Sequence, residues 1–397
     1  MKKLFSLLLI MVMSLGTFAG CGNQSEVRTP ETTGTAAANP AETALTQPEA
    51  AEDAAIEVTD MRGRTILIPA DVQRVVVTFN LEEYFAVAGE AGIDKLVGYS
   101  HAYWEGRRED AWEAFTAKYP QLREIADVGY NDGINVETII SLAPDVVIMS
   151  SPVNYTFIES SLDNLSAAGI AVVFIDYHTQ TVETHGESTR IIGKVLGQEA
   201  RAEEIASFYA DQMALIAERL STLPENAEKP KVYMEFSRGV GTYGNTWSER
   251  MWGALIRECG GENIAAGMEG NSVEIAPEQV IASNPDLIVF TASPQTDIDD
   301  NVVLGYGTDG APARAHLAAY LDREGWSGLN AVQSGNLGAL YHDLSRHIFD
   351  FAGAQFLAKL IHPELFADVD PEANLAEFFD RYMPTELSGA WMITLNG

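Results

Sequence analysis

The feature that most constrains the fold is a pattern that occurs twice along the chain. Glu137 is followed seven residues later by a Pro-Asp pair and a run of apolar residues (144–149). Glu278 is likewise followed seven residues later by a Pro-Asp pair and an apolar run (285–290). Each copy is typical of an acid at a helix start, two helical turns, a stop, and a buried strand. The repeat predicts two similar α/β lobes with a cleft between them, where small ligands commonly bind.

The rest of the chain fits the same architecture, because apolar runs alternate with helical patterns in both halves and so predict parallel strands with right-handed crossovers. Residues 199–222 carry apolar side chains at helical intervals without Pro or Gly, so we expect one long helix bridging two Rossmann-like lobes. A rod of about 22 residues spans about 33 Å, enough to cross between the lobes. The elements expected in the first lobe (56–198) are a hairpin at 56–69, strands at 74–78, 96–98 and 171–175, and helices at 82–91 and 162–168. In the second lobe (223–397) they are strands at 231–236 and 337–341 and helices at 348–360 and 375–382.

The first twenty residues are typical of a secretion signal. Lys2 and Lys3 precede an apolar stretch that is too short to remain as a membrane-spanning helix. Residues 18–21 resemble a bacterial lipobox, which implies that Cys21 carries lipid and holds the protein at the extracytoplasmic face of the cell membrane. The alternative is ordinary cleavage near Ala19, with Cys21 left as a free thiol. Residues 21–55 are poor in large apolar side chains, so we expect a disordered tether there.

The charge of the chain excludes some partners. Its formal net charge is −32, so we expect no binding to nucleic acid and no basic patch for anionic lipid. Beyond the signal no apolar run is long enough to cross a bilayer, so membrane attachment would depend on the lipid at Cys21. The other cysteine, Cys259, follows apolar residues and is expected to be buried.

Motifs along almost the whole body resemble those of the ABC-importer substrate-binding proteins that serve iron-siderophore, haem and cobalamin uptake, the class III periplasmic binding proteins. This resemblance implies two α/β lobes joined by one long helix, a permease dimer with its ATPase as partner, and little hinge motion. It also implies a monomer that captures an iron-siderophore-type metal chelate without a cofactor and without catalysis. The motifs lie at 58–64, 74–76, 135–137 with 144–145, 168–170, 260–263, 278 with 284–286, 326–332 and 362–364.

Glu137 and Glu278 admit two readings. An acid in the first turn of a helix complements the helix dipole and needs no partner. The resemblance implies a second role, in which one Glu on each lobe docks onto an Arg of a permease subunit. The two readings are compatible, since an acid in the first turn of a helix is also exposed.

Ligand contacts are expected from loops at the carboxyl ends of the strands, where open α/β sheets bind their ligands. The side chains there are mostly aromatic with a few cations, which suits a large, flat or anionic metal complex. Arg238 and Arg346 could instead pair with nearby acids such as Glu235 and Asp343. The candidate ligand-binding residues are Asn80, Tyr99, Tyr130, Tyr155, Tyr177, Arg238, Tyr243, Trp247, Tyr341, His342 and Arg346.

Other functions find less support in the sequence. The seven His are scattered, which disfavours a free zinc or manganese site, so no metal-ligating set is expected. Residues 239–244 spell G-x-G-x-x-G, but the preceding strand does not open the fold, which disfavours a dinucleotide site. The sequence contains no G-x-S-x-G, H-E-x-x-H or P-loop motif, which disfavours a hydrolase or chelatase-like enzyme. A surface adhesin is disfavoured by the paired lobes, whereas haem, cobalamin and a molybdate-like oxyanion stay open as ligands.

Overall fold

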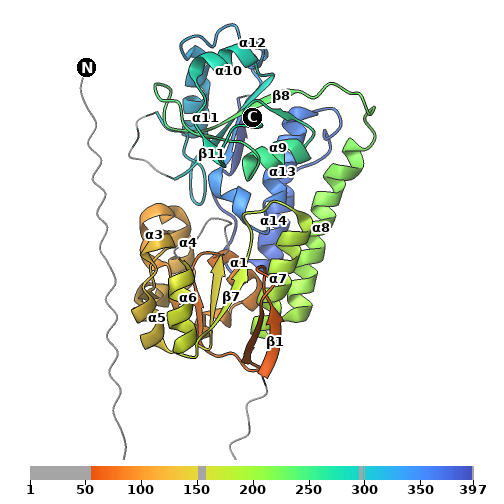
Figure 1. The fold of residues 1–397 in the computed structure, drawn as a ribbon. Helices are drawn as coiled ribbons and strands as arrows, with labels where there is room; N and C mark the ends of the chain where they lie inside the picture. The colour runs from red at the N-terminus through yellow and green to blue at the C-terminus, as the bar shows by residue number, and fades with distance from the viewer. Residues whose placement is uncertain (1–54, 151–157, 295–297, 299, 396–397) are drawn as a thin grey trace, which may run out of the picture. The chain divides into compact units, whose positions relative to one another are not determined.

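We describe a computed structural model, and the residues described are 55–150, 158–294, 298 and 300–395. Glu52–Gly397 forms one compact unit that contains two five-stranded sheets (Figure 1). The α/β class and its two lobes are therefore as the sequence predicts. None of the helices in the described ranges is long and apolar enough to cross a bilayer. Tyr155 and Cys21, two residues of the sequence analysis, lie outside the described residues.

The first lobe is built on an all-parallel sheet with the strand order β5-β4-β3-β6-β7. Its inner strand β6 is buried along its whole length, so both faces of the sheet are covered. The strands are β3 (Val75–Val77), β4 (Leu96–Tyr99), β5 (Ala126–Asp127), β6 (Val146–Ser150) and β7 (Ala171–Ile175), after a hairpin of β1 (Ala55–Thr59) and β2 (Thr65–Pro69). The helices are α1 (Leu81–Ala88), α2 (Gly92–Lys95), α3 (His101–Arg107), α4 (Glu109–Lys118), α5 (Val136–Leu142), α6 (Ile158–Ala167) and α7 (Val182–Leu196), with 3₁₀ turns η1 (Pro120–Glu124) and η2 (Asn131–Gly133).

The second lobe has the strand order β10-β8-β12-β13-β14, and only β14 runs antiparallel to its neighbour. Its strands are β8 (Lys231–Phe236), β10 (Glu262–Asn263), β12 (Leu287–Ala292), β13 (Leu337–Tyr341) and β14 (Met392–Thr394), beside a two-stranded ribbon of β9 (Thr246–Trp247) and β11 (Ser272–Val273). Its helices are α9 (Trp252–Glu258), α10 (Pro277–Ser283), α11 (Gly310–Ala319), α12 (Asn330–Ser334), α13 (Phe351–Ile361) and α14 (Pro371–Tyr382), with η3 (Tyr320–Asp322) and η4 (His342–Arg346).

The sequence repeat is also a structural repeat. Helices α5 and α10 end at residues with left-handed backbone, Ala143 at φ 44° and Asn284 at φ 47°. The acid that follows each helix ties it to the start of a neighbouring strand. Asp145 Oδ2 accepts from the Arg74 N–H at 2.7 Å, and Asp286 Oδ2 accepts from the Lys231 N–H at 2.9 Å.

The basic side chains at these strand starts close the same arrangement in both lobes. The Arg74 guanidinium donates to the carbonyls of Leu142 and Ala143 at the end of α5. Lys231 Nζ donates to the Ser283 carbonyl at the end of α10, at 3.4 Å. A cation at the carboxyl end of a helix satisfies free carbonyls and complements the dipole. Both helices are therefore held in the same way against their sheets.

The long helix α8 covers Glu199–Leu220, as its apolar spacing predicts. It packs against α1 and α7 of the first lobe and against α13 of the second (Figure 1). One continuous hydrophobic core includes Val75 of the first sheet, Ile205 of α8 and Val289 of the second sheet. The lobes thus share packed side chains along α8.

Several expected elements differ in extent from those observed. The helix expected at 82–91 ends at Ala88 because Gly89 follows with φ 68°, which favours glycine and stops a helix. The strand expected at 74–78 is reduced to β3, Val75–Val77. Helix α7 was not predicted, and it packs closely against α8: a Cβ at Gly193 would lie 2.3 Å from the Ala202 Cβ.

Candidate functional site

A cavity of about 430 Å³ lies between the two lobes, within the usual size range of ligand pockets. From the second lobe it is reached by the ends of three parallel strands, since Phe236 ends β8, Ser293 follows β12, and His342 follows β13. Ligands of open α/β sheets bind at this edge. The lining residues are Tyr103, Arg107, Tyr130, Asn131, Phe236, Ser293, His342, Asp343 and Arg346.

One wall of the cavity is aromatic. The rings of Tyr103 and Tyr130 stack with their centroids 4.1 Å apart and an angle of 27° between their planes. Phe79 lies behind both, 5.5 Å from Tyr130 and 5.6 Å from Tyr103. A planar or apolar part of a ligand could pack on the outer face or the edges of these stacked rings.

Cations lie beside the aromatic wall, because the Arg346 guanidinium is 5.3 Å from the centroid of the Phe79 ring. Arg346 donates from Nη2 to Asp343 Oδ1, and its Nε is buried without a hydrogen-bond partner. Burial lowers the pKa of Arg346, but the Asp343 carboxylate raises this pKa by more, so it lies above its ordinary value. Arg107 is an exposed cation on the same cavity. A free guanidinium N–H beside an aromatic wall suits a ligand with anionic oxygens.

His342 completes this side of the cavity as a neutral imidazole. Its ring lies edge-on to Phe236 at 4.9 Å and 5.4 Å from Trp247, and Nδ1 is 3.1 Å from Thr291 Oγ1. Burial and the nearby Arg346 charge lower the pKa of His342 to about 3. His342 can therefore offer an imidazole nitrogen or N–H to a ligand at neutral pH without adding charge.

Beneath the cavity a buried ion network joins the lobes. Arg108 of the first lobe pairs with Glu82 and, at 3.2 Å, with Asp343 of the second. Burial raises the pKa of Asp343, but the charges of Arg108 and Arg346 outweigh burial and hold this pKa well below its usual range. Glu83 accepts from His347 Nδ1 at 2.8 Å and from the Ile348 N–H at 3.0 Å. These charged contacts fix the floor of the cavity to both lobes.

Within the described part of the chain, one cluster has the composition of a metal site: Glu82, Glu83 and His347. Its carboxylates already face donors from the protein, because Arg108 contacts Glu82 and the Asn80 amide donates to Glu83 Oε2 at 3.1 Å. A guanidinium in this position repels a second cation. The cluster therefore fits the interlobe network better than a resident metal ion.

Some residues predicted from the sequence meet at the cavity and others do not. Tyr130, His342 and Arg346 line it, and the exposed Arg238 lies beside it with its guanidinium 5.4 Å from the Phe236 ring. Asn80 and Trp247 are buried one layer behind, where Asn80 donates to the Arg346 carbonyl and Trp247 packs on His342. Direct ligand contact by these two stays a prediction.

Three predicted tyrosines lie in the core, and each hydroxyl already has a protein partner. Tyr99 donates to the Leu122 carbonyl at 2.9 Å, the Tyr177 hydroxyl is 2.8 Å from Thr189 Oγ1, and Tyr341 donates to Asp110 Oδ1 at 3.3 Å. All three side chains are fully or almost fully buried. They do not line the cavity, because their side chains are buried in the core.

Tyr103, Asn131 and Ser293 also line the cavity, and they lie in segments that follow strands, where the sequence predicts ligand contacts. Three lining residues were missed: Arg107, Phe236 and Asp343. Tyr103 and Arg107 are four residues apart on α3, a spacing that brings two side chains to one helix face. That spacing was the available signal, but α3 itself was not predicted. The sequence suggests Asp343 as an ion-pair partner of Arg346, and the structure shows this ion pair.

The G-x-G-x-x-G loop surrounds a cation rather than a phosphate. The buried Arg323 guanidinium donates to the carbonyls of Val240 at 2.9 Å and Thr242 at 3.0 Å, and pairs with Glu235 at 2.7 Å. A phosphate site would present N–H groups, whereas these loop carbonyls point at the arginine. Glu235 thus pairs with Arg323 and not with Arg238. The predicted cleft residue Tyr243 belongs to this cluster, where its hydroxyl accepts from Trp326 Nε1 at 2.8 Å.

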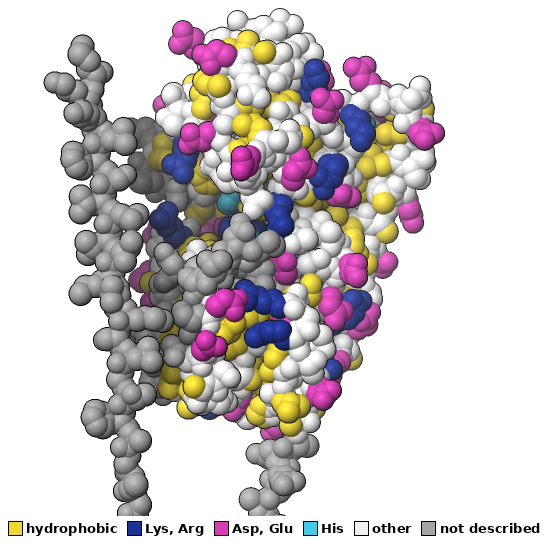
Figure 2. Space-filling model, viewed as in Figure 1, with side chains coloured by type: hydrophobic (Ala, Val, Ile, Leu, Met, Phe, Trp, Pro, Cys, Tyr) yellow, Lys and Arg dark blue, Asp and Glu magenta, His cyan; other side chains and the backbone are white. Residues whose placement is uncertain are grey.

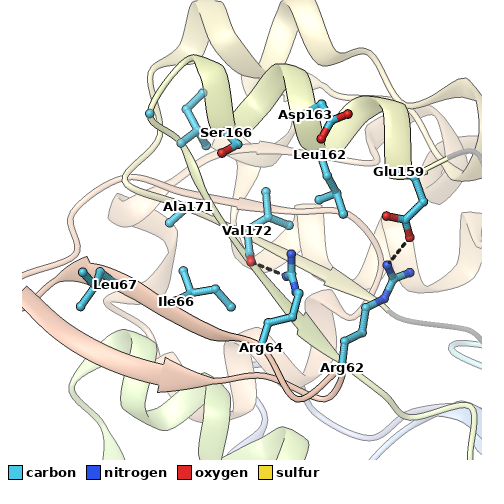
Figure 3. Close-up of a pocket in the computed structure, with 12 residues that line it drawn as sticks. Arg62, Arg64, Ile66, Leu67, Glu159, Leu162, Asp163, Ser166, Ala171 and Val172 are labelled. Carbon is cyan, nitrogen blue, oxygen red and sulfur yellow. Dashed lines mark hydrogen bonds and ion pairs between the residues drawn. The ribbon is translucent and has the colours of Figure 1, made fainter.

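A larger cavity of about 740 Å³ lies elsewhere, between β2 and α6 of the first lobe (Figure 3). Its two cations are already engaged: Arg62 pairs with Glu159 at 2.9 Å, and Arg64 donates to the Val172 carbonyl at 2.8 Å. Its cationic groups are therefore less available to a ligand than Arg346 in the cavity between the lobes. The candidate site is the cavity between the lobes.

The two predicted docking residues lie outside the candidate site. Glu137 is exposed in the first turn of α5, and Glu278 is exposed in the first turn of α10. Neither carboxylate forms an ion pair or side-chain hydrogen bond with the part of the chain that the structure describes. Figure 2 shows that acidic side chains are spread over the visible face of the molecule.

Comparison with known proteins shows which sequence family and which solved structures the chain is similar to. Residues 87–343 match the sequence family described as periplasmic binding protein. The solved structure of the TroA-like periplasmic binding protein FepB from Veillonella parvula is 34% identical, with a TM-score of 0.79, and the match covers 86% of this chain and 100% of that one.

Two curated relatives are also similar over much of their length. The uncharacterized ABC transporter substrate-binding lipoprotein YvrC of Bacillus subtilis (strain 168) is 26% identical over 253 residues, 63% of this chain and 72% of YvrC. The molybdate-binding protein MolA of Haemophilus influenzae is 21% identical over 351 residues, 83% of this chain and 91% of MolA.

Proposed function

The chain belongs to the periplasmic binding protein family, and we propose that it is the extracytoplasmic substrate-binding component of an ABC importer. In this role it captures a small molecule and delivers it to a permease dimer driven by an ATPase, without chemistry of its own. The name of the B. subtilis relative, an ABC transporter substrate-binding lipoprotein, supports this proposal. It also supports a lipid at Cys21 as the attachment to the membrane.

The observation that carries the ligand assignment is that aromatic rings and a cation line the same cavity. The stacked rings of Tyr103 and Tyr130 suit a flat or apolar organic framework. The unpartnered Nε of Arg346 suits an anionic oxygen. A metal chelate of the iron-siderophore type has both features, so we propose an anionic chelate as the ligand.

A molybdate-like oxyanion is the second candidate, because the molybdate-binding protein MolA is similar to 83% of this chain. The cations of the cavity suit an oxyanion equally well. The stacked tyrosines favour the chelate, because a small inorganic ion gains little from a π surface. Haem and cobalamin share the planar, apolar character of the chelate and belong in the same test.

The test is a titration of the purified protein with a ferric catecholate, a ferric hydroxamate, haem, cobalamin and molybdate. Trp247 packs on His342 at 5.4 Å and serves as the fluorescent reporter, with Trp247→Phe as the control for quenching elsewhere. We expect saturable quenching by a ferric chelate, with a Kd of about 1 µM or tighter. Binding of molybdate with none of the organic ligands would replace the chelate by the oxyanion. Binding of none of the five would contradict the proposal.

A further inference from the structure

Two exposed apolar side chains occupy matching positions in the structural repeat. The large apolar side chains that are exposed among the described residues are Leu67, Ile140, Val182 and Ile281. Ile140 lies three residues after Glu137 on α5, and Ile281 lies three residues after Glu278 on α10. Each of the two isoleucines is 38% exposed.

The spacing places each isoleucine beside its glutamate. Residues three apart on a helix are neighbours on one face. The residues just before them, Ile139 and Val280, are fully buried, so the exposed side of each helix carries Glu137 with Ile140 or Glu278 with Ile281. Because both helices are fixed to their sheets by the same contacts, each lobe presents the same acidic and apolar pair.

We infer that each lobe docks on the permease through a two-part contact, a glutamate together with the isoleucine one helical turn later. The partner side has a cation next to an apolar socket, once in each of two equivalent subunits. This inference rests on the proposed transport function. It adds an apolar half to a contact that the sequence alone describes as purely ionic.

Charge and symmetry both favour a permease with two equivalent subunits as the partner of this surface. Glu137 and Glu278 have no cationic partner among the described residues, in a chain whose net charge is −32, so a basic partner would complement them. A partner built from two equivalent subunits presents the same surface twice, and this chain carries the matching surface twice. An ion pair at an exposed rim contributes little by itself, so a buried apolar contact beside it would supply much of the affinity.

The surroundings of the two pairs show how each isoleucine is held. On the first lobe Glu137 and Ile140 line a hollow of about 670 Å³, together with Ile134, Val136 and Asn164. On the second lobe the Ile281 side chain is held against Gly325, where a Cβ would lie 2.7 Å from Ile281 Cδ1. Gly325 has φ 81°, so a side chain at that position would be strained and would also displace Ile281.

The experiment measures the affinity of the ligand-free, full-length protein for its cognate permease–ATPase complex in lipid nanodiscs. The variants are Ile140→Ala, Ile281→Ala and the double variant. Leu67→Ala and Val182→Ala, at the other two exposed apolar positions, are the matched controls. We expect each isoleucine variant to weaken docking about tenfold and the double variant by more. The controls and the conservative Ile140→Val and Ile281→Val should stay within about twofold of wild type.

Each outcome decides the inference. If the isoleucine variants dock like wild type while Glu137→Ala and Glu278→Ala weaken docking, the apolar half is wrong and the proposed function stands. If Leu67→Ala or Val182→Ala weakens docking as much as Ile140→Ala, the matched positions have no special role. If the wild type binds no permease complex, both the inference and the proposed function fail. Thermal unfolding and the affinity for a ferric chelate are measured for every variant. Values unchanged from wild type show that the fold of the variant is intact.

Discussion

Tyr103 and Tyr130 stack with their ring centroids 4.1 Å apart, and together they form a wall of the cavity between the lobes. One ring comes from α3 and the other from the residue before η2. Two different segments of the first lobe therefore supply one aromatic stack, and a ligand in the cavity could contact the outer face or the edges of this stack.

The first prediction concerns this surface. Tyr130→Ala should weaken binding of a ferric chelate by up to about tenfold, because an aromatic contact of this kind is worth roughly 0.5–1.5 kcal/mol. Tyr130→Phe keeps the ring and should remain within about twofold of wild type. The measurement is a calorimetric titration of both variants. Equal affinities for the Ala and Phe variants would remove the aromatic wall from the binding site.

The second prediction concerns pH and Asp110, which accepts from the Tyr306 N–H at 3.1 Å and from the Tyr341 hydroxyl at 3.3 Å. Burial raises the pKa of Asp110 from 3.8 to about 6, although Arg108 opposes the shift. A carboxyl with a raised pKa in the folded state holds a proton that the unfolded chain releases. Its contribution to stability is therefore present below pH 3.8 and is lost as pH rises to about 6.

Asp110→Asn removes this titration and keeps a side chain of similar shape. Relative to wild type, its free energy of unfolding should increase by about 2 kcal/mol between pH 4 and pH 7. Urea unfolding at a series of pH values measures the difference. A difference that stays constant over this range would show that Asp110 titrates normally in the folded protein.

The third prediction concerns the docking residues. Glu137→Ala and Glu278→Ala should each reduce uptake of a labelled chelate into cells, and the double variant should reduce it far more. Ligand affinity should change little, because both carboxylates lie outside the cavity. Uptake rates and dissociation constants are compared for the same variants. A loss of affinity as large as the loss of uptake would place these residues in the ligand site.

The fourth prediction concerns membrane attachment. Cys21→Ala should release the protein from membranes while the unfolding transition of its folded body stays unchanged, since the acidic chain offers no other attachment to anionic lipid. Fractionation followed by a salt wash gives the measurement. Sedimentation of the variant with washed membranes would contradict lipidation as the anchor.

The fold was predictable from the sequence where burial alone determines the local structure. Strands β7, β8 and β13 occur at the predicted residues because each is a short and mostly apolar run. Helix α7 was missed because it contains Gly186 and Gly193 and buries the polar His185, so its pattern is weak. Its glycines allow close packing on α8, and the tertiary contact stabilises a helix that local propensity does not.

The candidate site was predictable in part for similar reasons. Tyr130, His342 and Arg346 lie near strand ends, which the alternating pattern identifies. Arg107 could not be placed without α3, a seven-residue helix with little apolar periodicity. The sequence also predicted ligand contacts for three tyrosines at strand ends that are instead buried in the core: Tyr99, Tyr177 and Tyr341. Whether a side chain at a strand end faces the cavity or the core depends on tertiary packing, which the sequence pattern does not reveal.

The measurement that tests the central claim most directly is the affinity of a ferric chelate for wild type, Arg346→Gln and Arg238→Gln at low and high salt. Arg62→Gln, in the other large cavity, is the control and should bind like wild type. Each cavity variant should weaken binding by about 1–3 kcal/mol, because a charged hydrogen bond is lost. The loss should be smaller at high salt. Unchanged affinity in both cavity variants at low salt would contradict ligand capture by the cations of the cavity between the lobes.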